Sequence, residues 1–329
     1  MADCTNRPTL RALILLLSII VFVPALVSAE TWQYARRVSD VDGDGRPDPA
    51  VWRPRTATFY VLTSTSGYKS VTEYPLGVST DIPVSADYDG DGKVDFAVYR
   101  PSTNAWFVLL SKSQYSPISS VQFGFTGDIP VPADYDGDGI ADVAVYRPSD
   151  QGWYVLTSSS NFTAAFSKTW GSLTSVPVPA DYDGDGKLDI TSFISNAGTD
   201  PFNSGGWFVL QGGMNFTSAF SMLIGDVDSV PVPGDYDGDG KLDAAVYHSP
   251  SSTFYVLQGG TGFKTAFAKA WGVVGDQPAV GDYDGDGKLD IAVYRGGTWF
   301  ILTGGSRFTA AFALVLPGGT IADVPVLMP

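Results

Sequence analysis

Short runs of alternating apolar and polar residues, separated by turn residues, recur along the whole chain. In one stretch, an extended run at 128–134 is followed by an acidic loop and by a β-branched run at 143–147. Two further runs follow, at 153–157 and 164–170. Period-two alternation that ends at Gly, Pro, Ser or Asn is typical of β-strands. We see no helical period, so the pattern predicts four short strands in each unit.

An acidic nonapeptide, D-x-D-G-D-G-x-x-D, sets the length of the unit. Its spacings are 47, 47, 47, 54 and 47 residues, and its copies start at Asp40, Asp87, Asp134, Asp181, Asp235 and Asp282. A constant period in this range indicates repeated supersecondary units. Four-stranded units arranged radially form a β-propeller, which leaves only short, protected sheet edges. We therefore predict an all-β fold, a β-propeller of six four-stranded blades, with seven blades as the alternative.

The end of the sequence predicts how the ring closes. Residues 323–326 match residues 81–84, which precede an acidic loop. The last run is therefore a first strand without a blade of its own, and we expect it to pair with the first unit. Residues 31–39 compete for the same position in that sheet.

The fourth unit is seven residues longer than the others. The extra residues lie around 195–206, in the turn between its second and third strands. Insertions in repeat proteins map to loops on one face, which is often the binding face. The insertion therefore marks either a binding face or a neutral elaboration of the surface.

The nonapeptide has the chemistry of a calcium site. Ca²⁺ takes roughly six to eight oxygen ligands from carboxylates, backbone carbonyls and water. Aspartate occupies positions 1, 3, 5 and 9 of every copy. The glycine at position 6 permits a sharp turn that presents the carbonyl of position 7, whose side chain we expect to extend into solvent. The predicted ligands are Asp40, Asp42, Asp44, Arg46, Asp48, Asp87, Asp89, Asp91, Lys93, Asp95, Asp134, Asp136, Asp138, Ile140, Asp142, Asp181, Asp183, Asp185, Lys187, Asp189, Asp235, Asp237, Asp239, Lys241, Asp243, Asp282, Asp284, Asp286, Lys288 and Asp290.

The donor set selects the ion. Zinc and copper prefer nitrogen and sulfur ligands, which these loops lack. Mg²⁺ retains its waters and is seldom enclosed by protein alone. A solvated acidic turn would explain one such loop, but it does not explain six identical ones. We therefore expect about six Ca²⁺ ions per chain.

The acidic composition follows from the loops. The chain has 329 residues and a formal net charge of −15, and its loops alone carry 24 aspartates. Six bound Ca²⁺ ions would neutralise most of that charge. The balance argues against a nucleic-acid partner, which requires a basic face. Hydrophobic residues make up 44% of the chain, enough for a packed core.

The N-terminal residues read as a secretory signal. Arg7 and Arg11 precede an apolar stretch at 13–23, and small residues at 27–29 fit a cleavage site. We predict a signal peptide at 1–29 and a single propeller domain at 30–329, with an uncleaved anchor as the alternative. The only cysteine, Cys4, lies in the signal segment, so the mature domain has no disulfide. The expected location is secreted or at the cell surface, without membrane insertion after cleavage.

The motifs resemble a known repeat family. Phe123 and Gly124, the G-D-I-P run at 127–130 and the loop at 134–142 resemble the FG-GAP repeat, also described as VCBS-type. This repeat builds the propeller of integrin α-subunits and occurs in many secreted bacterial proteins. The resemblance covers residues 40–329 and implies a β-propeller with Ca²⁺ held between the first and second strands of a blade. Integrin propellers have seven blades, of which only some carry calcium, whereas all six units here have the motif.

Catalytic groups are scarce outside the loops. His248 is the only histidine and occupies a position where other units have arginine. Nucleophilic catalysis by a Ser–His or Cys–His arrangement therefore has little to use. We expect no enzymatic activity. A carboxylate-dependent enzyme acting on polysaccharides is the alternative.

Two repeated side chains suggest ligand contacts. Arg100, Arg147 and Arg295 follow a tyrosine at the end of the second strand and would form a ring on one face. Such a ring would suit acidic glycans or carboxylates, unless each arginine pairs with a loop aspartate of its own or the adjacent blade. The tryptophans that open the third strands are either sugar platforms or, as we favour, inter-blade core. They are Trp106, Trp153, Trp207 and Trp299.

The sequence therefore favours a secreted, calcium-binding propeller that acts as a binding or adhesion module. Its expected partner is an extracellular protein or glycan, and nucleic acid is not expected. A polysaccharide-active enzyme and a structural component of a surface or matrix are the alternatives.

Overall fold

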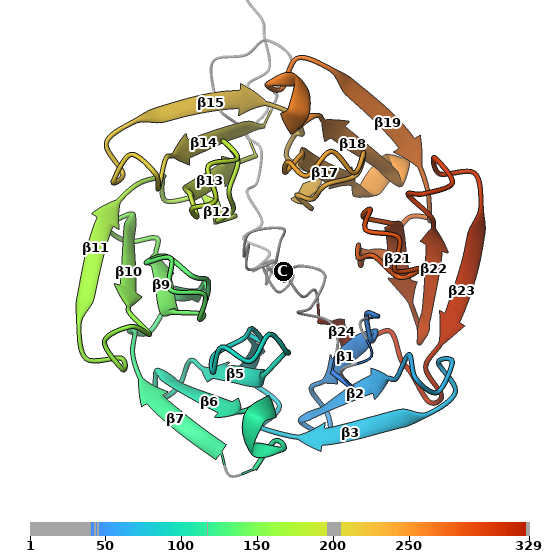
Figure 1. The fold of residues 1–329 in the computed structure, drawn as a ribbon, viewed down its shortest axis with the longest axis horizontal. Helices are drawn as coiled ribbons and strands as arrows, with labels where there is room; N and C mark the ends of the chain where they lie inside the picture. Colours follow the sequence, from blue (N-terminus) through green and yellow to red (C-terminus); the bar gives the residue numbers. More distant parts are fainter. Residues whose placement is uncertain (1–40, 43, 45, 117, 196–204, 327–329) are drawn as a thin grey trace, which may run out of the picture.

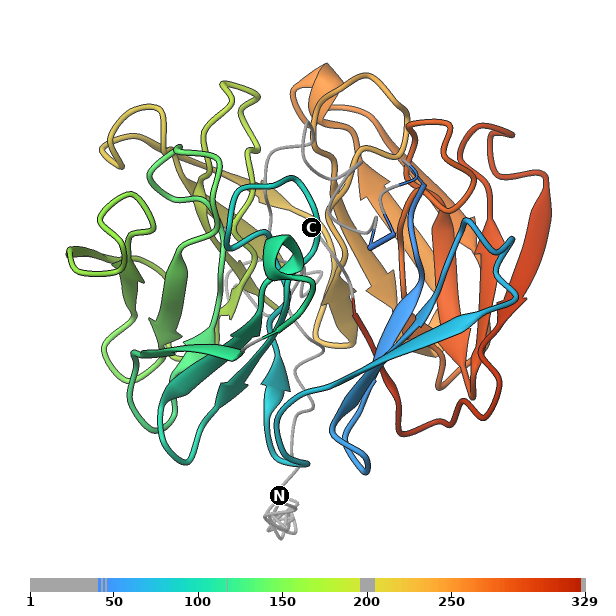
Figure 2. The ribbon, with the colours of Figure 1, turned by 60° about the horizontal axis from the view of Figure 1, so that its bottom comes forward.

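The computed structural model describes residues 41–42, 44, 46–116, 118–195 and 205–326. These residues form six four-stranded antiparallel sheets arranged around a central axis (Figure 1). The sheets stand side by side around the ring, with their connecting loops at the two ends (Figure 2). The prediction of a six-bladed all-β propeller is confirmed.

Each blade is a meander of four strands in chain order, except that the first blade takes its innermost strand from the C-terminal end. Blade 1 contains β24 (Val324–Pro325), β1 (Ala50–Arg53), β2 (Thr58–Leu62) and β3 (Val71–Pro75). Blade 2 contains β4 (Ile82–Pro83), β5 (Phe96–Arg100), β6 (Ala105–Leu109) and β7 (Ile118–Gln122). Blade 3 contains β8 (Ile129–Pro130), β9 (Val143–Arg147), β10 (Gly152–Leu156) and β11 (Ala165–Thr169).

The second half of the ring repeats this order. Blade 4 contains β12 (Val176–Pro177), β13 (Ile190–Ile194), β14 (Gly206–Leu210) and β15 (Ala219–Leu223). Blade 5 contains β16 (Ser229–Pro231), β17 (Ala244–His248), β18 (Thr253–Leu257) and β19 (Ala266–Ala270). Blade 6 contains β20 (Gln277–Pro278), β21 (Ile291–Arg295), β22 (Thr298–Leu302) and β23 (Ala311–Val315). Three single-turn 3₁₀ helices occur in the described part of the chain, at Ser111–Ser113, Ser249–Ser251 and Gly259–Thr261.

The ring closes by pairing the last strand with the first. In this register Val51 lies opposite Pro325 and Trp52 opposite Val324. The amide of Val326 also donates to the carbonyl of Ala50 at 2.9 Å. The predicted closure by the C-terminal strand is therefore confirmed, while residues 31–39 lie outside the described residues.

The innermost strands are short because of their prolines. Each has proline as its last residue, which cannot donate a ladder hydrogen bond and is tolerated at a sheet edge. The second strands behave differently. In β5, β9, β17 and β21 the first four residues are all buried, because each sheet packs between two neighbouring blades. Such strands read as continuous apolar runs instead of alternating ones.

The third-strand tryptophans belong to the core. Trp106, Trp153, Trp207 and Trp299 are at most 1% exposed. Trp106 packs in one cluster with Val143 and Val145 of the following blade, and Trp299 packs with Val51 and Leu62 across the closure. The interpretation of these residues as inter-blade core is confirmed.

Two predicted features fall outside the described residues. They are the signal segment at 1–29 and most of the insertion, at 196–204. Among the residues that are described, no helix combines the length and hydropathy needed to cross a bilayer.

Candidate functional site

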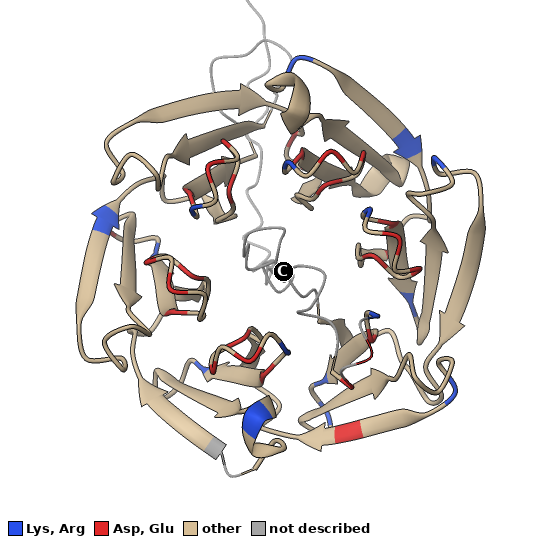
Figure 3. Ribbon diagram, viewed as in Figure 1, with Lys and Arg blue, Asp and Glu red and all other residues tan. Residues whose placement is uncertain are grey.

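The acidic loops gather at one end of the blades, close to the central axis of the ring. Figure 3 shows their aspartates on the loops that surround the axis. In blades 2 to 6 the loop connects the first strand to the second. An isolated β-bridge pairs the residue just before the loop with the aspartate at position 9, as between Ala86 and Asp95. The pseudo-symmetry of the propeller therefore brings loops that are far apart in the sequence together in one ring.

Hydrogen bonds to aspartate fold each loop. In blade 2, Asp87 accepts hydrogen bonds from the amides of Gly90 at 2.6 Å and Gly92 at 2.7 Å. Both glycines have positive φ, 72° and 79°, a conformation that is strained for residues with a side chain. Asp95 accepts from the amide of Tyr88 at 2.7 Å, across the loop. The alternation of Asp and Gly is therefore required by the backbone path as well as by any ligand.

The loops bring their carboxylates together. In five blades, three aspartates place one oxygen each within 4.8 Å of one another. The predicted ligands at positions 1 and 3 are in every such cluster, joined by position 9 in four blades and by position 5 in blade 5. The clusters are Asp87, Asp89 and Asp95; Asp134, Asp136 and Asp142; Asp181, Asp183 and Asp189; Asp235, Asp237 and Asp239; and Asp282, Asp284 and Asp290. In blade 1, Asp40 lies outside the described residues, whereas Asp42, Asp44 and Asp48 are described.

Burial makes the last carboxylate of each loop hard to ionise. Desolvation raises the pKa of this residue from 3.8 to about 7 in five blades, although backbone amides that donate to it act in the opposite direction. The residues concerned are Asp95, Asp142, Asp189, Asp243 and Asp290. In blade 1 the same cause raises the pKa of Asp48 to about 6. A divalent cation among these oxygens would favour the ionised form, so the donor set fits Ca²⁺.

The turn between the third and fourth strands also belongs to the site, which sequence reasoning missed. The Ser111 amide donates to Asp95 at 2.6 Å and its hydroxyl to Asp91 at 2.9 Å. Ser158 donates to Asp142 and Asp138 in the same way, at 2.7 and 3.0 Å. The signal was available as a small residue that recurs 16 positions after the last aspartate of the loop in blades 1, 2, 3 and 5, 23 positions after it in blade 4 and 14 in blade 6.

Blades 4, 5 and 6 have Gly-Gly at this turn. A β-carbon on Gly213, Gly260 or Gly305 would lie 1.4, 1.5 or 1.6 Å from a carboxylate oxygen of the facing loop. No side chain fits there, so the turn approaches the loop with its backbone. Blades 1 to 3 have Thr65, Lys112 and Ser159 at the corresponding position, and each of these residues donates a hydrogen bond to the position-3 aspartate of its loop.

The predicted extension of the position-7 side chains into solvent is wrong for two of them. Ile140 and Lys288 lie over the position-4 glycine of the preceding loop, whereas Arg46, Lys187 and Lys241 are exposed. A β-carbon on Gly90 would be 2.9 Å from Ile140 of the next blade, and one on Gly238 would be 2.7 Å from Lys288. Lys288 also donates to the carbonyl of Asp237 at 3.1 Å. The acidic loops of blades 2 and 3 and of blades 5 and 6 are therefore in direct contact.

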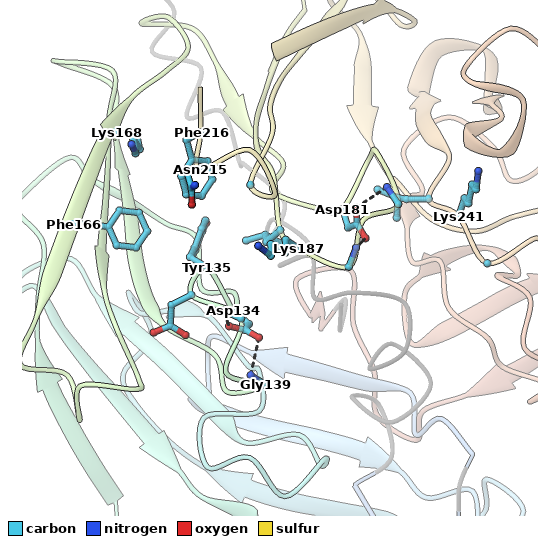
Figure 4. A pocket seen from close by; sticks show the side chains of 18 residues that line it. Asp134, Tyr135, Gly139, Phe166, Lys168, Asp181, Lys187, Asn215, Phe216 and Lys241 are labelled. Atoms are coloured by element: carbon cyan, nitrogen blue, oxygen red, sulfur yellow. Dashed lines mark hydrogen bonds between the residues drawn. The ribbon is translucent and has the colours of Figure 1, made fainter. Parts of the chain in front are cut away.

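A cavity interrupts these contacts beside blade 4. It has a volume of about 760 Å³ and extends from the blade-3 loop past the blade-4 loop to blade 5. Figure 4 shows Phe166 and Phe216 toward one end, Lys241 toward the other and Lys187 between them. This cavity lies on the same end of the ring as the acidic loops.

The ring of arginines is paired. Arg100 donates to Asp81 at 3.0 and 2.9 Å, and Arg147 donates to Asp128 at 2.8 Å through two nitrogens. Arg295 pairs in the same way with Asp276, but its side chain remains 42% exposed. These partners precede the first strand of the same blade and are not loop ligands. The sequence alternative is therefore right that the arginines are ion-paired, and wrong that their partners are loop aspartates.

Blades 4 and 5 lack this pair. Blade 4 has Ile194 in place of the arginine and Ser175 in place of the aspartate. In blade 5, His248 lies 3.3 Å from Asp226 and shares a hydrogen bond of 2.7 Å with Ser251. His248 thus takes the strand-end role that its position in the repeat predicts.

The fold is similar to several solved propellers. A lectin of Agrocybe aegerita that recognises non-reducing terminal N-acetylglucosamine aligns with a TM-score of 0.58 and 18% identity, over 89% of this chain and 84% of the lectin chain. BBS1N, in a complex with ARL6DN, aligns with a TM-score of 0.50 and 11% identity, over 90% and 85% of the two chains. A streptogramin B lyase aligns with a TM-score of 0.45 and 12% identity, over 72% and 69%. At 18% and 11% identity, the alignments with the lectin and with BBS1N show a shared fold alone.

Sequence comparison identifies the family. No curated protein matches the chain significantly. A family profile described as FG-GAP-like repeat matches four times, at residues 40–98, 87–145, 134–192 and 235–293. Each match begins at the first aspartate of an acidic loop. The chain belongs to the FG-GAP-like repeat family.

Proposed function

We propose that this protein is a secreted, calcium-stabilised propeller that binds an extracellular glycan or protein. The observation that carries the proposal is the repetition of one carboxylate cluster in five described loops, with three oxygens within 4.8 Å in each. Chance acidic turns would not recur with the same geometry around a ring. Secretion rests on the signal-like residues 1–29.

The aspartates at positions 1, 3, 5 and 9 and the carbonyl of position 7 would hold the ion. Ca²⁺ supplies the positive charge that buried carboxylates require. The protein contributes pre-organisation, because amides such as those of Gly92 and Ser111 already orient these carboxylates. Bound ions would therefore fix the loops that form one end of the ring.

The partner class is supported by fold likeness. The Agrocybe aegerita lectin recognises terminal N-acetylglucosamine, and BBS1N forms a complex with ARL6DN, which supports a glycan or a protein as the partner class here. A rigid ring that presents many short loops suits such recognition. The proposal is therefore a binding module, with calcium stabilising the loops that face the partner.

A glycan array, with a parallel pull-down from extracellular extracts, tests this proposal. Both should be run with millimolar Ca²⁺ and with EDTA. We expect a specific ligand that is retained with Ca²⁺ and lost with EDTA. Turnover of a polysaccharide by the purified protein, abolished by substituting carboxylates outside the loops, would contradict it.

A further inference from the structure

Among the residues described, the acidic loop of blade 4 lacks a backbone hydrogen bond that joins two other pairs of neighbouring loops. The amide of Ala141 donates to the carbonyl of Asp87 at 2.8 Å, and that of Leu289 donates to Asp235 at 3.0 Å. These bonds join the loops of blades 2 and 3 and of blades 5 and 6. Within the described ranges, the corresponding amides of Leu188 and Leu242 make no such bond. Both sides of the blade-4 loop are therefore open at the backbone level.

The contact between a position-7 side chain and a position-4 glycine is missing on the side that faces blade 3. A β-carbon on Gly137 would meet no described atom within 4 Å, whereas the equivalent positions Gly90 and Gly238 are covered at 2.9 and 2.7 Å. Lys187, the residue that would cover Gly137, instead lines the cavity and is exposed. The cavity of about 760 Å³ is the space left by this missing contact. That volume lies within the range of small-ligand sites, roughly 300–1,000 Å³.

Three lysines line this space together with three loop aspartates, Asp134, Asp136 and Asp181. Lys168, Lys187 and Lys241 line it, which is three of the nine lysines in the chain. In the part of the chain that is described, none of the three forms an ion pair. With Ca²⁺ neutralising the loop aspartates, these ammonium groups would leave the cavity cationic.

Lys168 differs from its counterpart in blade 5. Lys269 occupies the same repeat position, and its ammonium donates to the carbonyl of Phe308 at 2.7 Å. The Lys168 nitrogen instead lies 5.5 Å from the ring centroid of Phe216. The stacking of Phe166 on Phe216 has equivalents between blades 4 and 5 and between blades 5 and 6, so that contact itself is structural. The open lysines are what distinguish this junction.

We propose that this cavity binds an acidic oligosaccharide, with the lysines as partners of its carboxylates. The half-buried Phe216 ring and the exposed Asn215 amide would contact the faces and hydroxyls of the sugar rings. This inference rests on the proposed binding function and assigns it a site and a ligand class. Three proposed metal ligands, Asp134, Asp136 and Asp181, form part of the cavity wall, but the lysines and not these carboxylates would hold the sugar acid.

Binding of oligogalacturonate to the calcium-loaded full chain tests the site, with a neutral chitin oligomer as the comparison ligand. The test variant is the pair Lys168→Gln and Lys187→Gln, which removes two charges. The matched control is Lys264→Gln, an exposed lysine in a blade-5 turn that does not line the cavity. Melting temperatures with and without Ca²⁺ establish that every variant is folded.

We expect the double variant to bind oligogalacturonate at least about tenfold more weakly, with the control unchanged, since hydrogen bonds to charged groups carry at least this much. Binding should also weaken as salt rises. Equal binding by the folded double variant and the wild type would overturn the site. Binding of the chitin oligomer alone would overturn the ligand class while leaving the proposed function intact. A protein partner with no glycan binding would overturn this inference only.

Discussion

Arg53 and Asp323, 270 positions apart in sequence, form a two-pronged ion pair that closes the propeller. The Nε and one terminal nitrogen of Arg53 each lie 2.8 Å from an oxygen of Asp323. Tyr294 of the last blade donates to the same carboxylate at 3.2 Å. The pair is the repeat's own Arg–Asp pair, used here between the two ends of the chain. One carboxylate therefore joins the C-terminal strand to both blade 1 and blade 6.

Asp323→Asn should destabilise the whole ring. The Asp323 side chain is fully buried, and removing one partner of a buried pair leaves an uncompensated charge, which costs roughly 3–5 kcal/mol. Chemical unfolding measures this change. As the control, Asp150→Asn alters an aspartate that is 47% exposed and should change stability by at most about 1 kcal/mol. Equal stability of the two variants would argue against a closing role.

The same pair predicts an acid-dependent difference between wild type and Asp323→Asn. Burial alone would raise the pKa of Asp323, but hydrogen bonds from Arg53 and Thr320 and the charge of Arg53 lower it below 3.8. The stabilisation is therefore present above the unfolded pKa of about 3.9 and is lost as pH falls through the lower folded value. Unfolding free energies of both proteins from pH 6 to pH 2.5 should converge at the acid end. A constant difference would contradict this account.

Calcium removal should lower the melting temperature strongly. A ligand that binds only the native state stabilises it by mass action, about 2.7 kcal/mol per site at a hundredfold excess over Kd. Thermal unfolding in EDTA and in 10 mM CaCl₂ measures the difference. Because loops in all blades are affected, the shift should exceed that of a single site. MgCl₂ at the same concentration is the control and should have a much smaller effect.

Gly213→Ala should disturb the acidic loop of blade 4. The added β-carbon would fall 1.4 Å from the Asp185 carboxylate, so the turn or the loop must move. Overpacking of this kind costs roughly 1–3 kcal/mol. Lys112→Ala alters the equivalent position of blade 2, where a side chain already exists and is exposed, and should change stability by at most about 0.5 kcal/mol. Calcium-loaded melting temperatures compare the two, and a tolerated Gly213→Ala would refute the close approach.

Much of the fold could be predicted from the sequence because one repeat length applies to the strands, the loops and the blades. Spacing of the acidic loops predicted the blade number, and the match between 323–326 and 81–84 predicted the closure. The run at 143–147 coincides with β9. Its β-branched residues favour a strand, and it is bounded by Asp142 on one side and Pro148 on the other. Local pattern and global topology agree in this chain, which made both predictable.

The parts that were missed depend on contacts between separate segments. The Ser111 hydroxyl reaches Asp91 only after two strands have folded back, so the acidic motif does not predict the contact, and its signal is a small residue repeated from blade to blade. Ile140 and Lys288 were expected in solvent because the glycines that they contact, Gly90 and Gly238, belong to the preceding blade, about one repeat away in sequence. The cavity beside blade 4 likewise arises from contacts that are absent at Gly137, and the sequence has no signal for a missing contact.

The number of calcium ions bound per chain tests the central claim most directly. Metal-free protein should be titrated with Ca²⁺ by equilibrium dialysis or calorimetry at neutral pH. We predict saturable binding of about six ions with Kd values of about 10⁻⁴–10⁻³ M, the range of extracellular modules. Asp138→Ala should lower that number by about one, since its loop loses a ligand. No saturable binding at millimolar Ca²⁺ would contradict the account.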